Sequence, residues 1–226
     1  MIKEISIGTI GKILLPIIQI IKYKLKIDRK SPMIRHIRRK QPRKILEIGV
    51  HQGDFAKRML NGLKQNNFSN IEYTGIDLFA ELQTSEIYKK EKTLWPDSRE
   101  TVYSKLNLEF PGLNIRLLSG FSDELLHKLF GEKFDLIFID GGHSRETVYS
   151  DWVLSQPLLA EHGVIYFDDY TNSKGLRNSG FGINYVVDEI DNKQWHISIS
   201  KIRDWFIKDW GILTLRIVKV QRKYPQ

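Results

Sequence analysis

The sequence predicts an α/β fold with a doubly wound, mostly parallel sheet of seven strands and an antiparallel hairpin at its C-terminal edge. From Lys44 onward, strand-like apolar runs alternate with helical patterns, which is typical of a parallel sheet covered on both faces. Residues 134–140 and 163–168 are almost continuously apolar, as doubly buried strands require. A chain of 226 residues, 41% of them hydrophobic, suffices for one such domain.

The expected elements follow one another along the chain. Strands are expected at residues 44–49, 71–77, 114–119, 134–140 and 163–168. Helices are expected between them at residues 55–65, 100–109, 123–129 and 144–159. A short helix after Gly182 then leads into the hairpin of residues 195–200 and 212–220, where apolar and polar side chains alternate. Residues 79–98 have weak periodicity and form either a lid over a pocket or a long surface connection.

The formal net charge of +8 belongs to one short stretch of the chain. Residues 22–44 contain eleven Lys or Arg and a single acid, Asp28, whereas the other residues hold 24 basic and 26 acidic side chains. We therefore divide the chain into an N-terminal apolar helix with a basic arm, residues 1–43, and a catalytic domain, residues 44–226. The basic run itself could also be a solvated face.

The N-terminal segment carries a nine-residue apolar run, residues 13–21. It is too short to cross a bilayer, which takes about 20 apolar residues, and lacks a signal-peptide cleavage site. Two interpretations remain: a helix packed on the domain or on a second subunit of a homo-oligomer, or a helix in a membrane interface with the basic arm on anionic head groups. The chain has no cysteine, which fits a reducing cytoplasm, so we expect a cytoplasmic protein with peripheral membrane contact as the alternative.

A glycine turn follows the first expected strand in the order Glu47-Ile-Gly49-Val-His51-Gln-Gly53. Glycines there let the backbone bend and approach a ligand closely. His51 stands where a dinucleotide fingerprint has its second glycine, which disfavours a pyrophosphate site. Asp77 ends the second strand, where a carboxylate can bind both hydroxyls of a ribose.

These features resemble the class I S-adenosylmethionine-dependent methyltransferases, over residues 44–170. The shared pattern is the acid and glycine turn at Glu47, the acid Asp77, and the turn Ser119-Gly-Phe-Ser-Asp123, each after a strand. The resemblance implies a Rossmann-like fold, S-adenosylmethionine as cofactor, and an adenine turn. Its implied cofactor-binding residues are Glu47, Gly49, Val50, His51, Gly53, Asp54, Asp77, Leu78, Ser122, Asp123 and Asp140.

Three carboxylates stand at the ends of the fourth and fifth strands: Asp140, Asp168 and Asp169. Because these strands lie side by side in a doubly wound sheet, the carboxylates should converge, and like charges so close need a cation or a proton. A hard divalent ion such as Mg²⁺ suits oxygen ligands. Without a metal, Asp140 would contact the amine of the cofactor's methionine part and Asp168 would cap a strand end.

Within the class, the chain is most similar to the catechol-type enzymes and to metal-assisted sugar O-methyltransferases. This resemblance implies a metal on Asp140, Asp168 and Asp169, although the third ligand in those enzymes is an amide. His143 stands where they carry a basic lysine, and imidazole titrates near neutrality. We therefore predict His143 and Asp140 as catalytic residues, with a loop-ordering role as the alternative for His143. Candidate walls of the acceptor pocket are Trp152, Tyr170 and Phe181.

The expected function is methyl transfer, assisted by a metal, to a hydroxyl of a small-molecule or carbohydrate-like acceptor. One alternative is a nucleic-acid methyltransferase that uses the basic arm. It is disfavoured, because Asp140-Gly-Gly-His143 replaces the Asn/Asp-Pro-Pro-aromatic motif of enzymes that methylate exocyclic base nitrogens, and the arm lacks interleaved aromatic residues. Another is a cofactor-binding or assembly protein without catalysis, which would not need Asp140, His143, Asp168 and Asp169.

Overall fold

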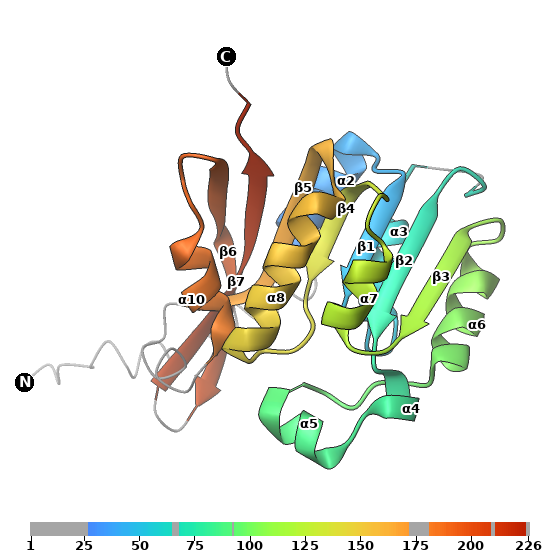
Figure 1. Cartoon of the computed structure of the whole chain (residues 1–226), viewed down its shortest axis with the longest axis horizontal. Helices are drawn as coiled ribbons and strands as arrows, with labels where there is room; N and C mark the ends of the chain where they lie inside the picture. Colours follow the sequence, from blue (N-terminus) through green and yellow to red (C-terminus); the bar gives the residue numbers. More distant parts are fainter. Residues whose placement is uncertain (1–26, 65–67, 92, 172–180, 209–210, 225–226) are drawn as a thin grey trace, which may run out of the picture.

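The computed structural model of the protein describes residues 27–64, 68–91, 93–171, 181–208 and 211–224 (Figure 1). Within these residues, seven strands form one sheet in the order β3-β2-β1-β4-β5-β7-β6. The strands are β1 (Lys44–Ile48), β2 (Glu72–Asp77), β3 (Asn114–Ser119), β4 (Phe134–Ile139), β5 (Leu159–Thr171), β6 (Trp195–Lys208) and β7 (Gly211–Arg222).

The pairing of the strands confirms the predicted sheet. β1 to β5 pair in parallel, and β7 lies antiparallel to both β5 and β6. The C-terminal hairpin is longer than the alternation of apolar residues indicated, because its first strand continues to Lys208. Starting from β1, the next strands along the chain, β2 and β3, are added toward one edge of the sheet, whereas β4 and β5 are added toward the other edge. The carboxyl ends of β1 and β4 therefore mark the point where the strand order reverses.

Helices cover both faces of the sheet (Figure 1). One face carries α7 (Ser122–Lys128), α8 (Arg145–Ser155) and α10 (Gly182–Glu189), which pack on the first of two apolar clusters. The other face carries α2 (Ser31–Lys40), α3 (Asp54–Leu60) and α6 (Arg99–Glu109), which pack on the second cluster. A short 3-10 helix, Gln156–Leu158, leads from α8 into β5.

The heptapeptide Ser-Arg-Glu-Thr-Val-Tyr-Ser occurs twice, at residues 98–104 and 144–150, and begins α6 and α8 in the same way. In each copy the serine is the N-cap, and its hydroxyl accepts a hydrogen bond from the backbone N–H three residues later. The valine of each copy, Val102 or Val148, is fully buried. The repeat therefore encodes a helix start with one inward face, used once on each side of the sheet.

Residues 79–98 leave the sheet at the carboxyl end of β2 and form two short helices, α4 (Phe79–Leu82) and α5 (Ser85–Glu91). In Figure 1 they lie below the edge where the parallel strands end. Helices this short give little periodicity in the sequence, which explains the weak pattern.

The described part of the basic arm is not a free tail. In α2, Met33, Ile34 and Ile37 are buried against the sheet, while Arg38, Arg39 and Lys40 in its last turn remain exposed. The apolar run at residues 13–21 lies outside the described residues. No helix in the described part of the chain is long and apolar enough to cross a membrane.

Candidate active site

A cavity of about 880 Å³ opens at the carboxyl ends of the parallel strands. Ten of the eleven residues predicted to bind a cofactor line it: Glu47, Gly49, Val50, His51, Asp54, Asp77, Leu78, Ser122, Asp123 and Asp140. The eleventh, Gly53, shapes the turn below the cavity. Residues of α5 and of the arm line the cavity as well. Its volume is in the range of small-molecule and cofactor sites.

The turn after β1 requires glycine at position 49. Gly49 has φ of 91°, and a β-carbon there would overlap the carbonyl oxygen of Asp140 on the neighbouring strand. Gly53 has φ of 79° and is the N-cap of α3. The turn therefore passes very close to the end of β4, which joins the predicted cofactor turn to the predicted catalytic residues.

Asp77 has a structural role that the sequence did not reveal. Its Oδ2 accepts hydrogen bonds from the backbone N–H groups of Val50 at 2.7 Å and His51 at 2.8 Å, and its Oδ1 accepts one from Phe79 N at 2.9 Å. His51 and Phe79 both have positive φ, 55° and 51°. Asp77 thus holds two strained backbone segments in place at the rim of the cavity, and its binding of a ribose stays a prediction.

Glu47 is buried in the floor of the cavity, and the hydroxyl of Tyr73 donates a hydrogen bond to it. Burial raises the pKa of Glu47 to about 8, although the Tyr73 hydrogen bond and the charge of Lys30 act in the opposite direction. A cationic group entering the cavity would favour the charged carboxylate.

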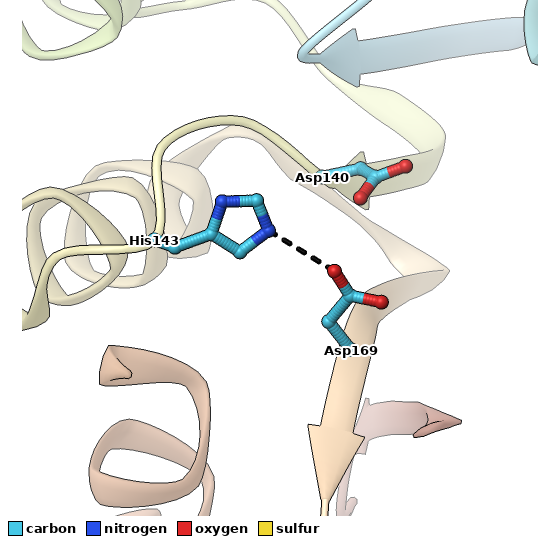
Figure 2. A group of neighbouring side chains, drawn as sticks. All are labelled: Asp140, His143 and Asp169. Carbon is cyan, nitrogen blue, oxygen red and sulfur yellow. Dashed lines mark hydrogen bonds and ion pairs between the residues drawn. The ribbon is translucent and has the colours of Figure 1, made fainter. Parts of the chain in front are cut away.

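Asp140, His143 and Asp169 come together on the other side of the cavity (Figure 2). One potential ligand atom from each lies within 4.8 Å of the other two. The predicted convergence of acidic side chains from β4 and β5 is therefore present, with His143 as part of it. Asp169 reaches this position through an irregularity in the β5–β7 pairing between Phe167 and Tyr170, where Asp169 has φ of 60°.

Both ring nitrogens of His143 are engaged. Nδ1 lies 3.0 Å from the carbonyl oxygen of Glu91, and Nε2 lies 3.0 Å from Asp169 Oδ2. Since a backbone carbonyl and a carboxylate are hydrogen-bond acceptors, this arrangement favours the doubly protonated, cationic ring. Burial would lower the pKa of His143, but Asp169 and then Asp140 raise it. His143 could act as a base only in its neutral form, so the predicted catalytic role stays a prediction.

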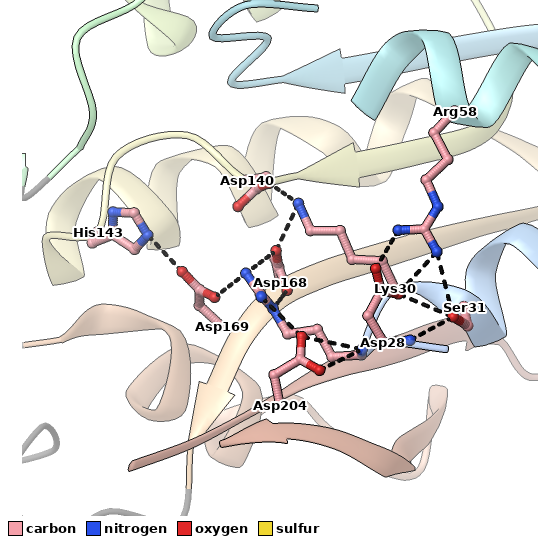
Figure 3. A network of polar contacts seen from close by, with 10 residues as sticks. Asp28, Lys30, Ser31, Arg58, Asp140, His143, Asp168, Asp169 and Asp204 are labelled. Atoms are coloured by element: carbon pink, nitrogen blue, oxygen red, sulfur yellow. Dashed lines mark hydrogen bonds and ion pairs between the residues drawn. The ribbon is translucent and has the colours of Figure 1, made fainter. Parts of the chain in front are cut away.

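Two cations from the arm enter the same cluster: Lys30, which Figure 3 shows between Asp140 and Asp168, and Arg29, which pairs with Asp168 and Asp169. Lys30 Nζ lies 2.6 Å from Asp140 Oδ2 and 2.8 Å from Asp168 Oδ2. The Arg29 guanidinium donates to Asp168 from Nε at 2.7 Å and from Nη2 at 2.9 Å, and Nη2 also reaches Asp169 Oδ1 at 2.9 Å. In the sequence neither residue differs from the rest of the basic run, yet both line the cavity.

These cations set the charge state of the aspartates. Burial alone would raise the pKa of Asp168, but Lys30 and Arg29 outweigh it and hold that pKa well below its usual range. For Asp140, burial and the charges of Asp168 and Asp169 prevail over Lys30 and raise the pKa to about 7. Asp168 is thus a fixed anion, and Asp140 is the carboxylate that can exchange a proton near neutral pH.

The predicted metal ligands Asp140, Asp168 and Asp169 do not fit a divalent ion in this structure. Both oxygens of Asp168 are bound by Arg29 and Lys30, and its side chain is only 1% exposed. An ion on the alternative set of Asp140, His143 and Asp169 would lie close to the Lys30 ammonium and would need a lone pair from His143. The cation that the three carboxylates require is already part of the chain.

The predicted pocket walls are only partly correct. Phe181 lines the cavity and stacks on His143 with ring centroids 4.8 Å apart. Trp152 packs against Phe167 and Trp195 in the core, so it is not a wall. Tyr170 is also a core residue. Residues 172–180, where the resemblance gave no acceptor region, lie outside the described residues.

Residues 79–98 contribute to the cavity, as the lid interpretation expected. Glu91 at the end of α5 accepts hydrogen bonds from Ser144 N at 2.9 Å, Ser144 Oγ at 3.0 Å and Thr147 Oγ1 at 3.1 Å. Its backbone carbonyl also holds His143. Glu91 therefore attaches α5 to the first turn of α8 and to the catalytic cluster. Nothing in the weak local pattern of the sequence indicated this residue.

The fold and the cavity define a class: a Rossmann-like α/β protein with a ligand site where the strand order reverses. A profile of the family described as "Methyltransferase domain" matches residues 46–170, which is more than half of the chain. The chain therefore belongs to this methyltransferase family. A search of curated proteins gives no significant match.

Solved structures of methyltransferases share the fold at low sequence identity. The O-methyltransferase TomG of Streptomyces achromogenes, in complex with S-adenosylmethionine, is 13% identical, with a TM-score of 0.58 over 84% of this chain and 78% of that chain. The methyltransferase PaMTH1 of Podospora anserina, bound to S-adenosylhomocysteine, is 18% identical, with a TM-score of 0.57 over 86% and 77%. An O-methyltransferase of Bacillus cereus is 15% identical, with a TM-score of 0.57 over 83% and 77%.

Proposed function

We propose that this protein transfers the methyl group of S-adenosylmethionine to a hydroxyl of a small-molecule or carbohydrate-like acceptor. The observation that carries the proposal is that the predicted cofactor turns and the Asp140, His143 and Asp169 cluster line one cavity. Neighbouring structures with bound S-adenosylmethionine or S-adenosylhomocysteine support the choice of cofactor.

The cofactor end of the cavity is the part formed by β1, β2 and the start of α7. Asp77 would bind the ribose, and Gly120, Phe121, Ser122 and Asp123 line the cavity where the adenine would lie. Glu47 offers a carboxylate for the ammonium group of the methionine part, whose charge would favour the ionised form of Glu47. The charged side chains at the ends of β4 and β5 would then surround the place where the cofactor's methyl group is transferred.

S-adenosylmethionine supplies an electrophilic methyl carbon bonded to sulfur. The acceptor oxygen forms a bond to that carbon as the carbon–sulfur bond breaks, and the electron pair of that bond stays on sulfur. Asp140 accepts the hydroxyl proton, because its pKa of about 7 suits a base at neutral pH. The positive charge of His143, held by Asp169 and Glu91, favours negative charge on the acceptor oxygen through its electrostatic field, since both of its N–H groups are already donated.

The nucleic-acid alternative receives less support from the structure. Arg29 and Lys30, two of the cations in the basic arm, are paired with carboxylates inside the protein, so their charges do not belong to an exposed surface that could follow a phosphate backbone. The exposed side chains of Phe121 and Leu94, which line the cavity, suit an apolar or ring-containing acceptor better than a phosphate backbone.

The test is an acceptor screen with radiolabelled S-adenosylmethionine and a panel of hydroxylated small molecules, phenols and sugars, with RNA as a comparison. We expect label to enter a hydroxyl-bearing small molecule, and substitution of Asp140 by Asn to reduce that rate about 100-fold. Label that enters only RNA, or that enters small molecules equally well in the Asp140→Asn variant, would contradict the proposal.

A further inference from the structure

The positive charge at the catalytic cluster comes from the arm of the chain itself. We propose that Lys30 occupies the place that the catechol-type resemblance gives to a metal ion, that its ammonium binds the acceptor's hydroxyl oxygen, and that transfer needs no divalent cation. The role of Lys30 toward the acceptor rests on the proposed function. The absence of a metal requirement is a separate claim about the carboxylates and can be measured without an acceptor.

Lys30 is placed for direct contact with a ligand. Its side chain is 15% exposed and lines the cavity, while Nζ bridges Asp140 and Asp168 at 2.6 and 2.8 Å. Nζ also lies over the rings of Phe55 and Phe138, 4.3 and 4.9 Å from their centroids. An ammonium group has three hydrogens, and the two carboxylates use two of them. The third is available to an oxygen in the cavity beside Asp140, the proposed proton acceptor.

The turn that carries Lys30 is fixed from several sides (Figure 3). Asp28 pairs with Arg58 of α3 and accepts a hydrogen bond from Ser31 Oγ at 3.0 Å. On the other side of Lys30, Arg29 pairs with Asp168 and Asp169, and its Nη1 lies 3.2 Å from Asp204 of β6. Such anchoring holds the ammonium group in one position, which an electrostatic catalyst requires.

Each carboxylate of the cluster is paired with a cationic side chain of the protein itself. Asp140, Asp168 and Asp169 lie against three cationic groups, those of Arg29, Lys30 and His143, and Asp204 contacts Arg29 from the outer side. A divalent ion on Asp140 would come close to an ammonium that already pairs with the same carboxylate. Because like charges repel strongly in a partly buried site, the ion and Lys30 exclude each other.

The first test titrates Mn²⁺ into the purified full-length protein and follows free Mn²⁺ by electron paramagnetic resonance. We expect no stoichiometric binding, and we expect turnover in EDTA to equal turnover with added Mg²⁺ or Mn²⁺. One tightly bound Mn²⁺ per chain that is lost in the Asp140→Asn variant would overturn the proposal, and so would loss of turnover in EDTA that Mg²⁺ restores.

The second test substitutes Lys30 by Met, with Lys40→Met as the matched control on the exposed end of the same arm. We expect Lys30→Met to reduce kcat about 100-fold, as for loss of one charged donor at a reacting oxygen, with S-adenosylhomocysteine affinity within about threefold of wild type. Lys40→Met should change neither value. A folded Lys30→Met variant with kcat near wild type would refute the role of Lys30.

The two proposals fail in different ways. If calorimetry shows no binding of S-adenosylhomocysteine to the wild-type protein, the proposed methyl transfer is wrong, while the Mn²⁺ titration still decides whether the carboxylates take a metal. If Lys30→Met does not fold, the wild-type Mn²⁺ titration and the EDTA comparison decide the metal claim without it.

Discussion

The two ends of the cavity are built in different ways. The cofactor end consists of turns that directly follow β1, β2 and β3, and its shape depends on backbone conformations such as that of Gly49. The catalytic end depends on paired charges, and its partners lie far apart in the sequence: Arg29 and Asp168 are separated by 139 residues. One end is therefore encoded by local motifs, whereas the other exists only after the chain has folded.

This difference explains why the sequence indicates positive charge at these strand ends but does not show Arg29 and Lys30 there. Three carboxylates at two adjacent strand ends require positive charge, and the sequence shows this requirement. It does not show that residues 29 and 30 reach those strand ends, because their pattern there is only a run of basic residues. In a cluster of paired, buried charges, we expect substitution of any one charged side chain to lower the free energy of unfolding strongly.

The largest expected effect comes from removing the carboxylate of Asp168, the shared partner of the cations at the catalytic end of the cavity. Substitution of Asp168 by Asn leaves the Arg29 guanidinium and the Lys30 ammonium without their shared partner. We expect the free energy of unfolding to fall by about 3–5 kcal/mol, the range for a broken buried ion pair, as measured by urea denaturation. The control is Glu189→Gln, which removes the partner of Arg145 in a pair whose side chains are 55% and 61% exposed. It should cost less than about 1 kcal/mol, and equal losses in the two variants would contradict the comparison.

At the cofactor end, we expect a change in backbone conformation, and not the loss of a charge, to weaken ligand binding. Gly49→Ala places a β-carbon against the carbonyl of Asp140 at positive φ, and we expect S-adenosylhomocysteine affinity to fall about 100-fold in calorimetry. Gly131→Ala is the matched control, since Gly131 also has positive φ, 99°, but a β-carbon there meets no atom within 4 Å. It should leave affinity unchanged. Wild-type affinity in Gly49→Ala would show that the turn does not bind the cofactor.

The exposed end of the arm, near His36, differs from the catalytic end of the cavity because its positive charges are not balanced. Burial, followed by Lys219, Arg39 and Lys40, lowers the pKa of His36 from 6.5 to about 4. The unfolded chain thus takes up a proton below about pH 6.5 that the folded chain refuses until about pH 4, so stability is lost as the pH falls through this window.

We expect this single histidine to cost about 2 kcal/mol of unfolding free energy between pH 7 and pH 5. The reference is His36→Phe, which keeps a ring against Tyr166 and cannot titrate. Urea denaturation of both proteins at both pH values gives the difference. The same loss in His36→Phe would assign the effect to other groups.

The smallest effect concerns the lid. Glu91→Gln weakens three hydrogen bonds that attach α5 to the start of α8. Ile87, Lys90 and Leu94 of this region line the cavity, so a looser α5 should bind the ligand less well. We expect S-adenosylhomocysteine affinity to fall about fivefold, or about 1 kcal/mol. Glu86→Gln on the exposed side of the same helix should have no effect. Equal affinities in the two variants, measured by calorimetry, would mean that α5 does not cover the bound ligand.

The strands and most helices were predictable because each depends on a local pattern. The apolar runs of β4 and β5, the glycines of the β1 turn and the serine caps of α6 and α8 are all contiguous in the sequence. The engagement of Asp77 by backbone amides, the protonation of His143 and the burial of Trp152 depend on contacts between distant segments. Such contacts decide which residues of a correctly predicted edge can act as bases, ligands or walls.

The most direct test of the account is a calorimetric titration of the purified full-length protein with S-adenosylhomocysteine in the presence of EDTA. We predict binding of one molecule per chain, with the same affinity when Mg²⁺ replaces EDTA. Absence of binding in both buffers would contradict the assignment of the cavity as a cofactor site, and binding only with Mg²⁺ would contradict a site whose cations come from the chain.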